Sequence, residues 1–157
     1  MRLALYQPDI PQNTGTILRL AACMKTGVDI IEPCGFIFSD RKFKRAGMDY
    51  IDAMDIIRHP TWEAFKSAAP GRIVLLTTKA DHRYTDFAFQ ADDTLLLGRE
   101  SKGVPDTVHQ DVDARILIPM APNMRSLNIA VSAAMVLGEA LRQTHLFETP
   151  ALSQQLG

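Results

Sequence analysis

The chain has 157 residues, of which 46% are hydrophobic and 22% charged, and its formal net charge at pH 7 is −1. This length predicts one globular domain with a sizeable core, and the near-neutral charge argues against a protein coated for indiscriminate nucleic-acid binding. No stretch is apolar enough for a transmembrane helix, and the apolar run at the start is too short for a signal peptide, so we expect a cytoplasmic protein.

Strand-like and helix-like segments alternate along the chain. Strands are predicted at residues 2–6, 28–33, 72–78, 94–98 and 114–120, and helices at 12–25, 61–68, 104–110 and 126–144. Residues 39–47 are predicted as a short helix or turn, residues 50–57 stay ambiguous, and the tail after about residue 147 is expected to be loosely ordered. The alternation predicts one α/β domain over residues 1–157, with a mostly parallel sheet and helices on both faces.

The last predicted helix is apolar on nearly every side. Between Leu127 and Leu137 almost every residue is apolar or small. A surface helix carries one apolar stripe, whereas a helix that is apolar all round is buried on several sides. We therefore predict a homodimer with this helix in the interface, and a central core helix in a monomer is the alternative.

Side chains that ligate metals are few and scattered. Cys23 and Cys34 are the only cysteines and form no C-x-x-C pair, and the four histidines show neither H-E-x-x-H nor H-x-H spacing. We expect no metal site and two reduced cysteines that serve as packing residues.

One basic cluster stands out against the balanced charge. Arg41, Lys42, Lys44 and Arg45 surround Phe43 in the sequence RKFKR. Cations around an aromatic ring suit contact with RNA phosphates combined with stacking on a base, although a solvated basic turn is the alternative.

The common nucleotide-binding motifs are absent. Residues 95–105, LLLGRESKGVP, have the two glycines of a P-loop, but Val104 and Pro105 stand where the loop requires Lys and Ser or Thr. The glycine-rich turn that a Rossmann domain or a doubly wound methyltransferase places after its first strand is missing. No G-x-S-x-G elbow of an α/β-hydrolase occurs.

Three polar clusters remain, each after a predicted strand. In the first, Asn13 is a candidate N-cap, and Gly15 and Arg19 are four residues apart on one helical face. An arginine at this position either belongs to a functional site or directs its guanidinium group to solvent or to a carboxylate.

The second cluster, Gly98 to Pro105, predicts a tight loop with exposed backbone N–H and C=O groups that could recognise a nucleoside; a plain surface turn is the alternative.

The third cluster runs from Ile118 and Met120 to residues 125–128. Ser126 is a candidate cap for the last helix, with or without a ligand at the helix N-terminus.

Taken in this order, the clusters resemble the SPOUT superfamily of RNA methyltransferases over residues 1–145. The shared motifs are N-x-G-x-x-x-R at 13–19, G-x-E-x-x-G-h-P (h, apolar) at 98–105, I-P-M at 118–120 and R-S-L-N at 125–128. The resemblance implies a C-terminal trefoil knot, an obligate homodimer, and S-adenosylmethionine as the cofactor.

The resemblance also implies roles for individual residues. The cofactor would contact Leu76, Gly98, Gly103, Ile118, Met120, Ser126 and Leu127. Arg19 would orient a ribose 2′-hydroxyl and stabilise the developing alkoxide, since arginine stays protonated and makes a poor base. Asn13 would position Arg19, with Glu100, Ser126 and Asn128 completing the network. RNA phosphates would contact Arg41, Lys42, Lys44 and Arg45, from the partner subunit.

The short N-terminus, the lack of an extra RNA-binding domain and the sequence LTTK at 76–79 resemble the minimal members of the superfamily. These methylate the ribose of the wobble nucleotide, position 34, a cytidine or modified uridine, of leucine tRNAs. A SPOUT enzyme acting on another tRNA position or on ribosomal RNA is one alternative, and a non-enzymatic RNA-binding module is another. The chain departs from the family pattern at Arg99, where proline is usual, in the sequence IAVS around Val131, and at Gly138, where tyrosine is frequent.

Overall fold

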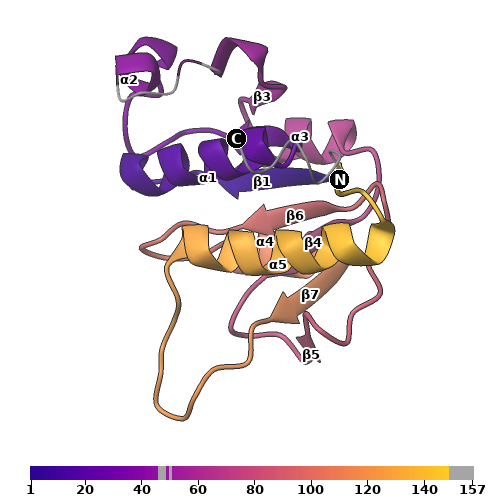
Figure 1. The fold of residues 1–157 in the computed structure, drawn as a ribbon. Coiled ribbons are helices and arrows are strands. Elements are labelled where there is room, and N and C mark those ends of the chain that lie inside the picture. Colours follow the sequence, from indigo (N-terminus) through magenta and orange to yellow (C-terminus); the bar gives the residue numbers. More distant parts are fainter. Residues whose placement is uncertain (46–48, 50, 149–157) are drawn as a thin grey trace.

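The computed structural model describes residues 1–45, 49 and 51–148, and in them one seven-stranded sheet (Figure 1). The strands are β1 (Arg2–Tyr6), β2 (Gly27–Ile31), β3 (Ile56–His59), β4 (Ile73–Leu76), β5 (His82–Arg83), β6 (Thr94–Leu97) and β7 (Ala114–Leu117). The helices are α1 (Pro11–Cys23), α2 (Asp40–Arg45), α3 (Trp62–Ala68), α4 (Asp106–Asp111) and α5 (Ile129–Thr144), and a 3-10 turn covers Ile51–Ala53. The order in the sheet is β3-β2-β1-β6-β4-β7-β5, and every pairing between these strands is parallel.

Two apolar clusters cover the two faces of this sheet. In β1, Leu3 and Leu5 face the cluster that includes α1 and α5, whereas Ala4 and Tyr6 face the cluster that includes α3 and α4. Side chains of a strand alternate between faces, so a strand that is apolar throughout must be covered on both sides. The predicted α/β class, with helices on both faces, is confirmed.

Several predicted boundaries and caps were wrong. Asn13 does not cap α1: the helix begins earlier, at Pro11, whose fixed φ suits a first turn, and Ile10 precedes it without a side-chain cap. Ser126 does not cap α5 either. Asn128 caps it, because its Oδ1 accepts from the N–H groups of Ala130 and Val131 at 2.8 and 3.3 Å. The ambiguous residues 50–57 contain the 3-10 turn and the first two residues of β3, residue 50 itself lying outside the described part.

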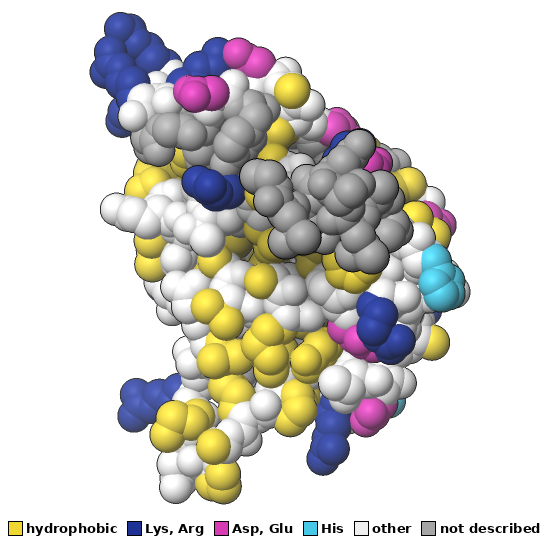
Figure 2. Space-filling model, viewed as in Figure 1, with side chains coloured by type: hydrophobic (Ala, Val, Ile, Leu, Met, Phe, Trp, Pro, Cys, Tyr) yellow, Lys and Arg dark blue, Asp and Glu magenta, His cyan; other side chains and the backbone are white. Residues whose placement is uncertain are grey.

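Helix α5 is buried on one side and exposed on the other. Ala133, Val136 and Leu137 are fully buried against the sheet and α1. On the other side Val131 and Met135 are 49% and 39% exposed, and Leu127 just before the helix is 41% exposed. Figure 2 shows hydrophobic side chains gathered over α5. In a single chain the helix therefore presents an apolar face to solvent.

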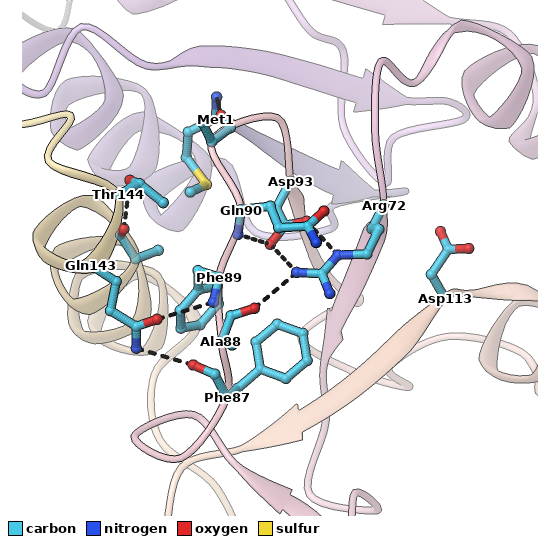
Figure 3. Close-up of polar contacts among 12 residues, drawn as sticks. Met1, Arg72, Phe87, Ala88, Phe89, Gln90, Asp93, Asp113, Gln143 and Thr144 are labelled. Atoms are coloured by element: carbon cyan, nitrogen blue, oxygen red, sulfur yellow. Dashed lines mark hydrogen bonds and ion pairs between the residues drawn. The ribbon is translucent and has the colours of Figure 1, made fainter.

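The connection from β5 to β6 is tied to β4 and α5 at the edge of the sheet where β4 and β6 begin (Figure 3). Arg72, just before β4, donates two hydrogen bonds of 2.8 Å to the buried carboxylate of Asp93. Gln143 of α5 accepts from the N–H of Phe89 and donates to the carbonyl of Phe87, both at 3.0 Å. These contacts fix the second half of α5 at the edge of the sheet where the strands begin, opposite to their carboxyl ends.

Within the described residues no helix is long and apolar enough to cross a membrane. The same residues hold no group of three or more His, Cys, Asp or Glu that could bind a metal ion. Both cysteines are free, but the expected packing role fits only Cys34, which is half-buried; Cys23 is exposed near the end of α1. The tail expected to be loosely ordered falls, from residue 149 on, outside the described residues.

Candidate active site

A cavity of about 510 Å³ lies at the carboxyl edge of the sheet, where the loops after β4, β6 and β7 meet the first turn of α1. Its size falls in the usual range for small-molecule sites. Its lining includes ten of the residues singled out by the motifs, namely Asn13, Leu76, Gly98, Glu100, Gly103, Ile118, Met120, Ser126, Leu127 and Asn128. Parallel strands bring their carboxyl ends to one edge, which is why segments so far apart in sequence converge here.

The loop after β6 closes on itself. The N–H of Arg99 donates to the carbonyl of Gly103 at 3.0 Å, and the N–H of Gly103 donates back to Arg99 at 2.9 Å. The sequence had suggested that the N–H groups of this loop are exposed, but these two are paired within the loop. A Cβ on Gly98 would lie 2.8 Å from two backbone atoms of Gly103, whose φ of +64° also favours glycine. Both glycines are therefore required for the shape of the cavity wall.

A chain of hydrogen bonds links the three motifs. The Nδ2 of Asn128 donates to the Oδ1 of Asn13 at 3.0 Å, and the Nδ2 of Asn13 points to the Oε1 of Glu100 at 3.5 Å. Asn128 is itself fixed by its capping bonds to α5. The side-chain orientations of Asn13 and Asn128 are therefore set by partners that come from distant parts of the sequence.

Glu100 is joined to a second carboxylate that the motifs did not single out. Its Oε2 accepts from the N–H of Asp9 at 3.1 Å, and the hydroxyl of Ser101 donates to the Asp9 carboxylate. Burial, followed by the hydrogen bond with Asp9, raises the pKa of Glu100. Hydrogen bonds with Glu100 and Ser101 lower the pKa of Asp9, so Glu100 is the member of the pair that holds a proton more readily. The position of Asp9 just after the first strand was the signal that could have found it.

Arg19 lies apart from this cavity. It is exposed on α1 and does not line the cavity. In residues 1–45, 49 and 51–148 no hydrogen bond joins Arg19 to Asn13, which instead contacts Glu100 and Asn128. Within one chain Asn13 does not contact Arg19, because residues six apart on a helix point about 120° away from each other. The positioning of Arg19 by Asn13 stays a prediction.

The basic cluster forms α2 and also lies outside the cavity. Arg41, Lys42, Lys44 and Arg45 are all exposed, and dark-blue side chains project at the upper left of Figure 2, over α2. Phe43 is only 7% exposed and packs against Phe38 with 5.1 Å between ring centroids. Its suggested use for base stacking was therefore wrong, since α2 buries this ring in the core.

The three departures from the family pattern disturb none of these contacts. The guanidinium of Arg99 lies over the ring of Tyr6, 5.8 Å from its centroid. Val131 lies on the exposed face of α5. A Cβ on Gly138 would meet no atom within 4 Å.

Comparison with known proteins identifies the family. Residues 1–138 match the model of the SpoU rRNA methylase family. The chain belongs to this family. Among the relatives of this SpoU member is a tRNA (cytidine(34)-2′-O)-methyltransferase of Beijerinckia indica, which is 61% identical over 144 residues, 90% of each chain. The predicted enzyme class, a methyltransferase, is confirmed.

Solved structures agree with this assignment. One, described as giving insight into 2′-OH methylation of C/U34 on tRNA, is 38% identical with a TM-score of 0.84 and covers 90% of this chain and 94% of its own. Another, an rRNA methyltransferase from Sinorhizobium meliloti with S-adenosylmethionine bound, is 29% identical with a TM-score of 0.81 and covers 94% of this chain and 57% of its own. S-adenosylmethionine, the predicted cofactor, is the methyl donor of the SpoU family.

Proposed function

We propose that this chain transfers a methyl group from S-adenosylmethionine to the ribose 2′-oxygen of the wobble nucleotide, position 34, of leucine tRNAs, with a cytidine or modified uridine as the target base. The observation that carries the proposal is the cavity at the carboxyl edge, which gathers residues of all the family motifs. The 61% identical relative, named for action on cytidine 34, supports the choice of nucleotide. A ribose methyltransferase acting on another tRNA position or on ribosomal RNA is the second candidate, favoured by the description of the family.

The cavity residues suit a nucleoside cofactor with a charged end. Leu76, Ile118, Met120 and Leu127 supply apolar surface, and Gly98 and Gly103 let the backbone approach closely, with Ser126 as a polar neighbour. When bound, S-adenosylmethionine supplies a methyl group on a positively charged sulfur. We propose that these seven residues hold the cofactor and keep water away from the sulfur.

The polar residues would act on the RNA side of the reaction. A ribose hydroxyl is a weak acid, so its oxygen needs a partner that stabilises negative charge as the proton leaves to a phosphate or to water. We assign this role to Arg19, because a guanidinium offers several N–H donors and a positive charge to the developing alkoxide. Asn13, Glu100, Ser126 and Asn128 would form the network that positions the ribose.

A homodimer would reconcile this role with the position of Arg19. Because Arg19 does not line the cavity of its own chain, it would complete the cavity of the partner subunit. The exposed apolar side chains of Leu127, Val131 and Met135 support an interface along α5. Within this proposal the enzyme is cytoplasmic, and the cations of α2 contact the tRNA.

The C-terminal part of the chain would form the trefoil knot of the superfamily. The connection from β6 through α4 to β7 crosses β4, and α5 then returns to the opposite face of the sheet. This crossing supports the knotted arrangement.

Purified protein, labelled S-adenosylmethionine and bulk tRNA from a host that lacks wobble-ribose methylation test the proposal. After digestion, mass spectrometry should find a 2′-O-methylated pyrimidine at the wobble position of leucine tRNAs. Label at another tRNA position, or only on ribosomal RNA offered in parallel, would favour the second candidate. Protein that neither binds the cofactor nor transfers the label would point to an RNA-binding module.

A further inference from the structure

A second hollow, of about 410 Å³, opens where β2 ends. Its lining contains the apolar side chains of Pro33, Cys34, Phe36, Ile37, Phe38 and Pro60 beside the charged Glu32 and Arg58. Ile37 is 76% exposed, more than any other large hydrophobic side chain in the described part of the chain. A single exposed isoleucine is ordinary, but one that borders an aromatic hollow marks a surface suited to a flat apolar group.

Exposed cations follow this hollow along the chain. The guanidinium of Arg58 lies over the ring of Phe38, 5.1 Å from its centroid. It also pairs with Glu32, the one carboxylate in the lining, so the negative charge of Glu32 is neutralised. Directly after the hollow the chain enters α2, whose cations are exposed. An apolar floor with cations beside it is the combination that holds a stacked base and its phosphates.

The hollow adjoins the candidate active site. The N–H of Gly35 donates to the carbonyl of Pro8 at 2.9 Å, and a Cβ on Gly35 would lie 2.7 Å from the Cβ of Asp9. On its other side, Asp9 donates its N–H to Glu100, which lines the cavity. Residues 8–9 therefore form a thin wall between the hollow and the site.

We propose that the hollow formed by residues 32–38 and 58–60 binds a base of the RNA substrate next to the nucleotide that is methylated. The base stacks against Phe36 and Ile37, and the cations of α2 contact the neighbouring phosphates. This inference rests on the proposed function and adds to it a subsite outside the cofactor cavity, which would select RNAs whose loop can turn a second base outward.

The test uses a leucine anticodon stem–loop and the Ile37→Ser variant of the full chain. We expect KM for the stem–loop to rise about tenfold, a loss within the range for one stacked base, with kcat and the affinity for S-adenosylmethionine within twofold of wild type. Ile57→Ser is the matched control: Ile57 is 43% exposed, and because Ile56 packs against the α1 and α5 cluster, Ile57 faces the other side of the sheet. This control should leave KM unchanged.

Abasic substitutions show whether a base is what the hollow binds. Stem–loops with an abasic residue at each nucleotide flanking position 34 are compared, one at a time. At one position wild type should lose about as much as Ile37→Ser loses on the intact RNA, and the variant should lose nothing further. Additive losses at every position, an unchanged KM, or a changed oligomer size for Ile37→Ser would overturn the proposal.

Alkylation of Cys34 reports on the hollow without any substitution. Burial raises the pKa of the Cys34 thiol to about 11, so iodoacetamide at pH 9 should modify it slowly. Bound stem–loop should slow this further, while the reaction of the exposed Cys23 stays unchanged. Equal rates for Cys34 with and without RNA would contradict the proposal. Wild-type methyl transfer, measured in the same samples, separates a failure of this inference from a failure of the proposed function.

Discussion

Asn13 is the residue through which distant parts of the chain meet. An amide carries an acceptor and two donors in one plane, so it can accept from Asn128 and donate to Glu100 at once. The sequence placed Asn13 in a motif together with Arg19, but within one chain its hydrogen-bond partners are Asn128 and Glu100. Asn128 and Ser126 are both good caps, and only the path of the loop before α5 decides between them. Residue types thus predicted membership of the site, whereas the bonding partners depend on tertiary contacts.

Arg19 is the residue whose assignment depends most on chemistry. We expect Arg19→Ala to lower kcat about 100-fold or more, because it removes a group that stabilises developing negative charge. The affinity for S-adenosylmethionine, measured by calorimetry, should stay within twofold, since Arg19 does not line the cavity. Arg83→Ala, which removes an exposed arginine on β5, is the control and should keep full activity. Unchanged turnover in Arg19→Ala would refute the assignment.

Among the elements, the strands and the closed loop after β6 show what a local pattern can predict. The bounds of β1 were predicted to the residue and those of β6 to within one, because both are runs of buried apolar side chains. The two residues of β5 carry no such pattern, and β3 is a half-exposed edge strand, so neither was predicted. The loop of residues 98–103 was predicted as a tight turn from its glycines, but its internal pairing could not be read from spacing.

Gly98 and Gly138 form a matched pair for testing that loop. Alanine at Gly98 would force its Cβ against the backbone of Gly103, so we expect Gly98→Ala to weaken S-adenosylmethionine binding about tenfold or more. Alanine at Gly138 meets open space within α5, so Gly138→Ala should raise stability by about 1 kcal/mol, or Tm by about 3 °C, without changing affinity. Calorimetry and thermal unfolding measure both. Equal affinities in the two variants would show that the loop does not shape the cofactor site.

The molecule as a whole is organised by its parallel sheet. All strands end at one edge, and this places the motif residues of four segments around one cavity. The alternation of strands and helices was enough to predict this convergence. It was not enough to place Arg19 or the cations of α2 at the cavity. Arg19 lies on a part of α1 beyond the first turn that lines the cavity, and no residue of α2 lines it. A second subunit is the simplest way to bring them there.

The Val131→Asp variant tests the proposed dimer. Wild type should sediment at twice the chain mass of 17.4 kDa, and Val131→Asp, which places a charge in the apolar face of α5, should shift the population to monomer and reduce methyl transfer at least tenfold. Ile57→Asp puts the same charge on an exposed apolar position of β3 and should remain dimeric. Wild type that sediments as a monomer while fully active would rule out the shared site.

Methyl transfer to one leucine tRNA, prepared with either a ribose or a 2′-deoxyribose at position 34, shows whether the 2′-oxygen of this nucleotide accepts the methyl group. With labelled S-adenosylmethionine, we expect stoichiometric labelling of the ribose form and none of the 2′-deoxy form, although both bind. Label on the 2′-deoxy form would rule out transfer to the ribose 2′-oxygen of position 34, since the methyl group would then go to a base or to another nucleotide.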